Sequence, residues 1–478
     1  MSKKLQIALV LLVISFQLSD GRSLRKRYRP LTEELMKSFP YKLTVKWFST
    51  RIDKFGTVNN ENYAMRYLIC DQYFKKGNAP IIFYTGCESS ILHPAYQDSF
   101  VVYQMAEKFG ALVVFAEHRY YGKSIPTTGV NKKFLSAEYA MADMADLMVY
   151  LKKNIDGAEK SPIITIGGSY CGMMAGWMRM KYPYLVWGAW AASAPVAWFE
   201  NYTSQFAYDD TVTKDFTDAS PICSNLISKA WGQIDSIGAT AAGRNSLTKT
   251  FKFCDSSLLK TSVSPLTNLL VNVYTDLAEG DYPVPAQFIG NLPAYPVNAV
   301  CSFLNDSSLT GMALMENLFK GVNLFYNYTG NVKCISTSTN SSSGDIWDFQ
   351  ACTEMVMPIA SNGMFPYAPF SEEANKQQCL AEFGVAPRPQ WAIIRFGGRN
   401  MNMQSRIIFS NGGLDPWHPG GVLTTTNPEI DIVFIPNGAH HLDLEGYNPK
   451  NPPNVNKAVE GEISTVQTWI EEYNTKYL

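Results

Sequence analysis

Residues 163–172 read Ile-Ile-Thr-Ile-Gly-Gly-Ser-Tyr-Cys-Gly, and an apolar helical run over 173–180 follows them. A β-branched run, a glycine-rich turn and a helical run predict a strand, a tight turn and a helix. This is the setting of a nucleophile elbow, in which a serine occupies a strained turn and the next backbone N–H points toward an oxyanion. The elbow pattern is G-x-S-x-G, and this chain departs from it at Cys171, with Gly172 directly after. The alternative interpretation is a glycine-rich turn that carries no chemistry.

The run at 163–166 belongs to a series of short apolar runs. Those at 81–83, 111–115 and 187–190 are bounded by Gly, Pro or Asn, as buried parallel strands are. Between them, residues 137–154 carry apolar side chains at helical spacing, including a stripe of methionines that fits core packing. Alternating strands and helices predict an α/β sheet.

The strand pattern fades between residues 199 and 390, where Ser, Asn and Thr become frequent and helical runs such as 224–237 occur. Strand-like runs return at 406–409 and 431–435, and a helix is predicted over 459–473. We therefore expect an α/β domain in two parts that are split by a largely helical cap insert: 41–198, then the cap at 199–390, then 391–478.

The first residues have the order of a secretory signal peptide. Lys3 and Lys4 form a positive start, residues 5–18 form an apolar stretch of 14 residues, and polar residues close the segment by Gly21. That stretch is shorter than the roughly 18–20 residues that a membrane span needs. We expect a signal peptide over 1–21, a linker or propeptide over 22–40, and no membrane span.

Two features agree with an oxidising, glycosylating compartment. Four N-x-S/T sequons cluster in one segment, at Asn201, Asn305, Asn327 and Asn340. Six of the nine cysteines lie in the same region and predict three disulfides, although spacing alone leaves the pairing open: Cys223, Cys254, Cys301, Cys334, Cys352 and Cys379. No pair has CxxC spacing, so we expect no metal site.

An elbow serine needs an acid and a histidine later in the chain, in the order Ser, Asp, His. Asp415 stands on a turn after the first late strand, and His440 and His441 follow the second. A neutral imidazole takes the proton of the serine, and a buried carboxylate orients the imidazole. The order and the strand-end positions favour Ser169 as nucleophile, Asp415 as acid and one of the two histidines as base.

The chain has only five histidines. His93 lies in a predicted loop, His118 at a strand end and His418 beside the acid turn, and we interpret all three as structural. Neighbouring side chains point in different directions, so only one of His440 and His441 can reach the serine.

Several motifs also occur in the order found in one peptidase family: Glu117-His-Arg-Tyr-Tyr-Gly-Lys-Ser124, Gly167-Gly-Ser-Tyr170, Ala351-Cys-Thr-Glu354, Pro387-Arg-Pro389, Asn411-Gly-Gly-Leu-Asp-Pro-Trp417 and Gly438-Ala-His-His-Leu-Asp443. From about Lys46 to Tyr473 the sequence resembles the family of lysosomal Pro-X carboxypeptidase and dipeptidyl peptidase II. This resemblance implies an α/β-hydrolase fold with a helical cap inserted ahead of the acid turn, and no cofactor.

The resemblance also implies roles for individual residues. It makes His440, the first histidine of the pair, the base that works with Ser169 and Asp415. The family cleaves exopeptidase bonds after proline, and its apolar proline pocket corresponds to Met173, Met357 and Trp417. A pyrrolidine ring is apolar and has no N–H, so thioether and indole faces suit it. The implied disulfides are Cys223–Cys301, Cys254–Cys334 and Cys352–Cys379, and Cys70 is the odd cysteine.

The charge of the groups in the binding site decides which terminus of the substrate is recognised. An aminopeptidase needs a carboxylate for the substrate's ammonium group, whereas a carboxypeptidase needs a cation or donors for a carboxylate. Asp348 stands where the dipeptidyl peptidase branch places its amine-binding acid, and the alternative is an ordinary surface carboxylate. The sequence therefore favours a dipeptidyl peptidase, with a Pro-X carboxypeptidase as the alternative. Glu88 is a further candidate for substrate binding.

The chain departs from the family at the candidate oxyanion hole. A Gly-Asn-Glu-Gly loop of the family, whose backbone helps to form the hole, appears here as Gly-Cys-Glu-Ser over 86–89. The candidate donors are the backbone N–H groups of Tyr170 and Cys87. Since cysteines occur in two segments that converge on Ser169, a Cys87–Cys171 disulfide is one hypothesis, and two free thiols are the alternative. The competing interpretations are a glycoprotein of this fold whose activity these changes have impaired, and an esterase or lipase.

Composition limits the partners. The 41 Lys+Arg and 42 Asp+Glu residues give a net charge of −1, which argues against a nucleic-acid partner. Hydrophobic residues make up 46% of the chain, which excludes a disordered protein. We expect peptide substrates with proline next to the scissile bond, a secreted or lysosomal protein, and a homodimer as one candidate assembly.

Overall fold

The computed structural model describes residues 33–57, 60–126, 132–337 and 342–477. The predicted signal peptide, most of the predicted linker and the sequon at Asn340 lie outside the described residues. The chain forms two compact units. One, the sheet unit, consists of Tyr28–Thr203, Tyr282–Phe288 and Gln390–Leu478; the other, the helical unit, contains Ser204–Asp281 and Ile289–Pro389. The domain boundaries at residues 199 and 390 stay a prediction from the sequence.

The sheet unit is built on an eight-stranded sheet with the order β1-β2-β4-β3-β5-β6-β7-β8. The strands are β1 (Thr44–Arg51), β2 (Asn62–Cys70), β3 (Ile81–Tyr84), β4 (Leu112–Ala116), β5 (Ile163–Gly168), β6 (Val186–Ala192), β7 (Ile407–Gly412) and β8 (Ile430–Ile435). The pairs β1–β2 and β2–β4 are antiparallel, and all later pairs are parallel. The predicted parallel strands are confirmed, and the prediction omitted the antiparallel hairpin of β1 and β2.

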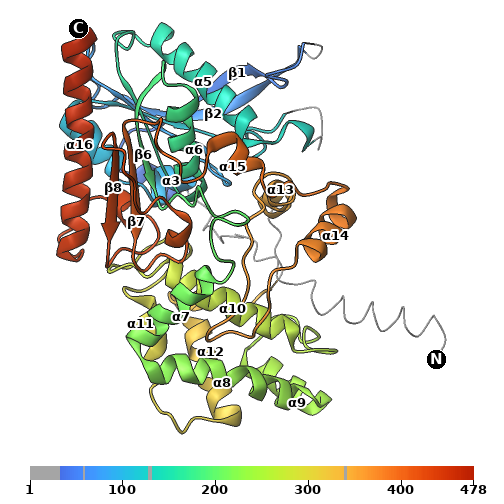
Figure 1. Cartoon of the computed structure of the whole chain (residues 1–478). Helices are drawn as coiled ribbons and strands as arrows, with labels where there is room; N and C mark the ends of the chain where they lie inside the picture. Colours follow the sequence, from blue (N-terminus) through green and yellow to red (C-terminus); the bar gives the residue numbers. More distant parts are fainter. Residues whose placement is uncertain (1–32, 58–59, 127–131, 338–341, 478) are drawn as a thin grey trace. The chain divides into compact units, whose positions relative to one another are not determined.

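Helices pack on both faces of this sheet (Figure 1). The helices of the sheet unit are α2 (Glu33–Ser38), α3 (Leu92–Gln97), α4 (Val101–Phe109), α5 (Ala137–Asn154), α6 (Ser169–Lys181), α15 (Trp391–Phe396) and α16 (Pro453–Tyr477), with short 3₁₀ turns η1 (Lys132–Phe134), η2 (His418–Gly420) and η3 (Leu442–Glu445). Helices α4 and α16 both contact η3 on one side of the sheet, whereas α5 packs on α6, which covers β5 and β6. This layering is that of an α/β-hydrolase fold.

The core explains the strand assignments. In β3, β4 and β5 every second residue enters one buried cluster, for example Ile82, Val113 and Ile164. Helix α16 covers that cluster with Val459, Ile463 and Val466, which follow the spacing of one helix face. The strands are buried on both faces, which explains their nearly continuous apolar sequence.

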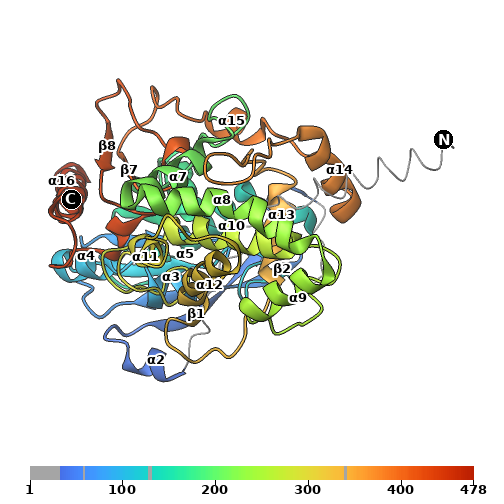
Figure 2. The same ribbon diagram turned by 90° about the horizontal axis from the view of Figure 1, so that it is seen from below.

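The helical unit contains α7 (Ala207–Ala219), α8 (Pro221–Gly238), α9 (Ala241–Thr250), α10 (Ser264–Glu279), α11 (Pro296–Cys301), α12 (Gly311–Asn327), α13 (Ser342–Ala351) and α14 (Glu372–Phe383). Helices α7, α8, α10, α11 and α12 pack together (Figure 2). Three disulfides staple the unit, and they are the pairs that the family resemblance implies: Cys223–Cys301, Cys254–Cys334 and Cys352–Cys379. None of the helices in the described part of the chain has the length and apolar composition of a membrane span.

Candidate active site

The elbow turn places Ser169 between β5 and α6. Its φ angle of 58° lies in the left-handed region, which is unusual for a residue with a side chain, and it is 5% exposed. The surrounding glycines are required by close contacts. A Cβ on Gly168 would lie 2.7 Å from the His441 ring, and a Cβ on Gly172 would lie 2.7 Å from the Ala192 carbonyl oxygen. Gly172 therefore provides the close approach of the helix to β6, and residue 171 is free to carry a side chain.

Asp415 and His440 follow β7 and β8, which are neighbours in the sheet. The Nδ1 atom of His440 lies 2.8 Å from Oδ1 of Asp415, and both side chains have no exposed surface. The same carboxylate oxygen accepts a hydrogen bond from the Trp417 backbone N–H at 2.9 Å. Since a carboxylate can only accept, Nδ1 of His440 carries the proton and Nε2 is the nitrogen that can act as a base.

Two glycines bring the turn after β7, which carries Asp415 (the acid turn), against the loop after β8, which carries His440 and His441 (the histidine loop). A Cβ on Gly412 would lie 2.3 Å from the Gly438 carbonyl oxygen, and one on Gly413 would lie 2.6 Å from that of Pro436. The backbone N–H of Leu414 donates to the Gly438 carbonyl at 2.9 Å. The hydroxyl of Tyr282 donates to the His440 carbonyl at 2.7 Å, which holds the histidine loop from another segment.

The second histidine of the pair has other partners. The backbone N–H of His441 donates to the hydroxyl of Ser193 at 2.7 Å, and its ring packs edge-on against Phe288. Its Nδ1 lies 3.7 Å from Oδ1 of Asp98. The two rings thus face different carboxylates, and only His440 faces Asp415.

The other three histidines lie outside this pair. Nδ1 of His418 bonds the Asp415 carbonyl at 2.7 Å, and His93 is buried in α3. Nδ1 of His118 donates to the Arg119 carbonyl at 2.7 Å, so its Nε2 accepts a hydrogen bond from the Tyr170 hydroxyl at 3.1 Å. Burial lowers the pKa of His118 to about 4, so the ring is neutral at physiological pH.

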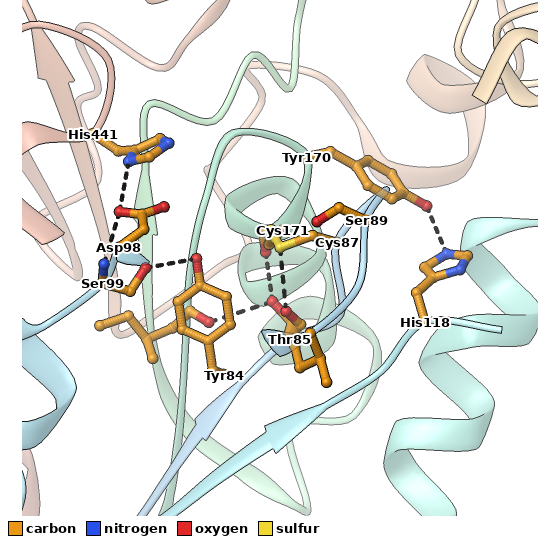
Figure 3. The surroundings of a disulfide bond; sticks show 12 residues. Tyr84, Thr85, Cys87, Ser89, Asp98, Ser99, His118, Tyr170, Cys171 and His441 are labelled. Atoms are coloured by element: carbon orange, nitrogen blue, oxygen red, sulfur yellow. Dashed lines mark hydrogen bonds and ion pairs between the residues drawn. A yellow bond between two sulfur atoms is a disulfide. The ribbon is translucent and has the colours of Figure 1, made fainter. Parts of the chain in front are cut away.

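The candidate oxyanion loop follows β3 and is attached to the elbow. A disulfide joins Cys87 to Cys171, with a Cα–Cα distance of 4.9 Å. Figure 3 shows this bond beside Thr85, whose hydroxyl donates to the Cys171 carbonyl at 2.6 Å. The Cys87–Cys171 disulfide, which was one of two hypotheses, is therefore present, and among the described residues Cys70 is the free cysteine.

The predicted substrate-binding residues are divided between the units. Met173, Trp417 and Glu88 belong to the sheet unit, where all three are buried; the Trp417 ring packs edge-on against Trp198. Met357 and Asp348 belong to the helical unit, where both side chains are partly exposed. Of the described sequons, Asn201 and Asn305 are exposed and Asn327 is half-buried.

Two buried carboxyl pairs near the histidine loop were not predicted. Asp443 accepts hydrogen bonds from the Ser410 hydroxyl at 2.6 Å and from the Trp190 indole at 3.2 Å, and burial raises its pKa to about 6. Burial and the charge of Asp443 raise the pKa of Glu462 well above its usual range. A sequence signal existed, because Glu462 lies at the spacing of the apolar face of α16.

The second pair consists of Glu445 and Asp98. Burial and the charge of Asp98 raise the pKa of Glu445 well above its usual range. Asp98 also faces His441, whereas Asp415 faces His440. In the residues that the structure describes, no group of three or more His, Cys, Asp and Glu side chains is arranged to hold a metal ion.

Comparison with known proteins agrees with this geometry. The family described as "Serine carboxypeptidase S28" matches residues 50–460. The lysosomal Pro-X carboxypeptidase of Homo sapiens is 37% identical over 98% of this chain and 98% of its own length. "Prolyl carboxy peptidase like protein 5" of Caenorhabditis elegans is 35% identical over 90% of this chain and 91% of its own, and the human thymus-specific serine protease is 25% identical over 89% and 87%.

Among solved structures, the carboxylesterase EstE1 from a metagenomic library is similar with a TM-score of 0.39 and 8% identity, covering 91% of this chain and 93% of its own. The family match spans most of the chain, from β1 to α16. The chain therefore belongs to the serine carboxypeptidase S28 family and is a serine-type exopeptidase.

Proposed function

We propose that this chain cleaves the peptide bond after proline, with Ser169 as nucleophile, Asp415 as acid and His440 as base. The observation that carries the proposal is the 2.8 Å bond between the buried His440 and Asp415 side chains. They follow two strands of the parallel sheet in which β5 ends at the elbow serine. The carboxyl ends of parallel strands meet at one edge of a sheet, where catalytic groups of such folds gather.

In the proposed reaction, Nε2 of His440 takes the Ser169 proton as the serine oxygen attacks the carbonyl carbon of proline. The bond from Nδ1 to Asp415 fixes the tautomer and stabilises the imidazolium that forms. The backbone N–H groups of Tyr170 and Cys87 are the proposed donors to the oxyanion. His440 then protonates the leaving amine, and a water molecule hydrolyses the acyl-enzyme by the same path.

The proposed proline pocket is lined by apolar side chains. It needs no acceptor for a backbone N–H of the bound proline, because proline has none. Met173 and Trp417 are buried side chains that flank the catalytic segments in sequence. Met357 is a further candidate that rests on the family resemblance. Thioether and indole groups provide polarisable apolar surface for a ring that has no N–H.

Two terminal specificities are each supported by a specific observation. The relatives of 37–38% identity are Pro-X carboxypeptidases, which supports release of the residue that follows proline at the carboxyl terminus. The acidic Asp348 supports recognition of a substrate ammonium group and release of a dipeptide. Glu88 is a separate candidate for the same role. The family is the same for both specificities, and the assay separates them.

The test offers the purified protein Lys-Pro and Ala-Pro amides with free amines, and an N-blocked peptide ending in Pro-Phe, between pH 4 and pH 8. Cleavage of the blocked peptide alone supports the carboxypeptidase, and cleavage of the free-amine substrates alone supports the dipeptidyl peptidase. A Ser169→Ala variant should be inactive on every substrate. Activity on simple esters with none on the prolyl peptides would contradict the proposal.

The role of Asp348 has a separate test. For a dipeptidyl peptidase, Asp348→Asn should raise KM for free-amine substrates at least tenfold, with kcat changed much less. Glu316→Gln, an exposed carboxylate on α12, is the matched control and should leave KM unchanged. An unchanged KM in Asp348→Asn would remove this residue from substrate recognition.

We also propose entry into the secretory pathway and residence in the lysosome or outside the cell. The predicted signal peptide, the exposed sequons and the lysosomal location in the names of the mammalian relatives support this route. A homodimer stays a prediction, which sedimentation velocity of the purified protein would test.

A further inference from the structure

The loop after β3 is attached to the elbow at a single residue by two different links. The disulfide joins the side chains of Cys87 and Cys171, and the hydroxyl of Thr85 bonds the Cys171 carbonyl at 2.6 Å. The backbone N–H of Thr85 also donates to the Ile166 carbonyl at 3.1 Å, so the loop continues the pairing of β3 with β5. Both cysteines are buried, with 6% and 4% of their surface exposed.

The same loop is also held from its other side, by His118. A Cβ on Gly86 would lie 2.5 Å from the backbone nitrogen of His118 and 2.9 Å from its Cα, so only glycine allows this approach. The ring of His118 in turn accepts the hydroxyl of Tyr170 at 3.1 Å (Figure 3). A closed circuit of contacts therefore runs from Tyr170 through His118, Gly86 and the Cys87–Cys171 bond back to the elbow.

Two residues of this circuit, Tyr170 and Cys87, carry the backbone N–H groups that the proposed mechanism assigns to the oxyanion. One donor, on Tyr170, belongs to the elbow, and the other, on Cys87, belongs to a loop that is distant in sequence. Donors aimed at a developing charge are effective only when their positions are fixed before the reaction. Donors on two separate segments keep a fixed spacing only if the segments are joined, and hydrogen bonds alone open more readily than a covalent bond.

We propose that the Cys87–Cys171 disulfide is a positioning cross-link that fixes the Cys87 donor relative to the Tyr170 donor. The inference rests on the proposed serine mechanism and adds to it a covalent element that stabilises the transition state indirectly. Cys87 and Cys171 are two of the positions at which this sequence departs from the motifs it resembles. The function of the bond is to orient the backbone, and its sulfur atoms take no part in the chemistry.

The test compares a Cys87→Ala/Cys171→Ala double variant with a Cys254→Ala/Cys334→Ala double variant. The two disulfides close similar lengths of chain, with sequence separations of 84 and 80 residues, so their removal should lower Tm to a similar extent. The preferred substrate of the wild type is used, and kcat is expressed per active site titrated with a fluorophosphonate. Removing Cys87–Cys171 should lower kcat ~10- to 100-fold with KM within about threefold, because one oxyanion donor is worth ~100- to 1,000-fold when lost entirely.

The control variant should keep the wild-type kcat per active site. Hydrogen exchange at residues 85–89 should be faster in the Cys87→Ala/Cys171→Ala variant than in the wild type. If the double variant does not accumulate, the single variants Cys87→Ala and Cys171→Ala each break the same bond with one change and should show the same loss of kcat.

The outcomes separate this inference from the proposed function. An active wild type whose Cys87→Ala/Cys171→Ala variant loses Tm but keeps kcat would overturn the positioning role and leave the serine mechanism intact. An equal loss of kcat in the control variant would also overturn it. A wild type that neither cleaves prolyl peptides nor reacts with the fluorophosphonate would overturn the mechanism and the inference together.

Discussion

The carboxyl group of Asp443 makes stability depend on pH in a way that one substitution can remove. Burial raises its pKa from the ordinary 3.8 to about 6. Between these values the folded chain holds a proton that the unfolded chain has lost, so stability falls as pH rises through this window. A pKa of about 6 in place of 3.8 corresponds to ~3 kcal/mol of unfolding free energy, which is present below about pH 4 and lost above about pH 6.

Asp443→Asn should remove this dependence while keeping the hydrogen bonds. An amide oxygen can accept from Ser410 and Trp190 as the carboxyl oxygen does, at 2.6 and 3.2 Å. The charged groups that face the site are Glu462 of α16 and Asp415, and loss of the Asp443 charge relieves both. The free energy of unfolding of the wild type should fall as the pH rises from 4 to 7. In Asp443→Asn this fall should be smaller by ~3 kcal/mol, because the contribution of the Asp443 carboxyl is absent.

Urea unfolding followed by tryptophan fluorescence at pH 4, 5, 6 and 7 measures this difference. Asp71→Asn, at an exposed position of the same unit, is the matched control and should follow the wild type. Equal falls in the wild type and in Asp443→Asn would refute the assignment of the titration to this carboxyl. A larger fall in the variant would reverse its sign.

Three further predictions follow from other contacts. Asp415→Asn should lower kcat/KM by about 10⁴-fold in a steady-state assay with little change in Tm, because an amide in place of the carboxylate stabilises the wrong tautomer of His440; a variant with wild-type kcat/KM would remove Asp415 from the mechanism. Gly172→Ala should lower Tm and the yield of folded protein, because its Cβ would lie 2.7 Å from the Ala192 carbonyl oxygen. Gly176→Ala is the control and should be tolerated, because its nearest contact would be at 3.6 Å. Equal Tm values for the two variants would contradict this prediction. Asp143→Ala should lower the free energy of unfolding, measured by urea unfolding, by ~3–5 kcal/mol, because it leaves the fully buried Arg119 without the carboxylate that lies 2.7 Å away. A loss below about 1 kcal/mol would show that water or another group compensates.

Local sequence determined much of the sheet unit. The run over 137–154 became α5 with the same bounds, because Ser136 caps its first turn and its apolar spacing is regular. Glycines of the elbow and of the acid turn lie at close contacts, with the backbone at Gly172, Gly412 and Gly413 and with the His441 ring at Gly168, so residue type alone indicated tight turns there. The hairpin of β1 and β2 was missed because β1 is largely exposed and mixes polar with apolar residues.

Other features depend on segments that are distant in the chain. Spacing could not distinguish His440 from His441, since the difference lies in which carboxylate each ring faces. The spacing of α16 indicates that Glu462 is buried, but it does not identify Asp443, a group on another element, as the carboxyl that it faces. The Cys87–Cys171 bond could be expected only because both segments were already assigned to the same site.

The central claim is that Ser169 is the nucleophile of this exopeptidase. The most direct measurement is mass mapping of the adduct formed when the native protein reacts with a fluorophosphonate, with peptidase activity followed in the same samples. We expect one adduct, on the peptide that contains Ser169, formed in proportion to the loss of prolyl peptidase activity and absent in Ser169→Ala. Full inactivation with the adduct on another residue, or retained peptidase activity in Ser169→Ala, would contradict the central claim.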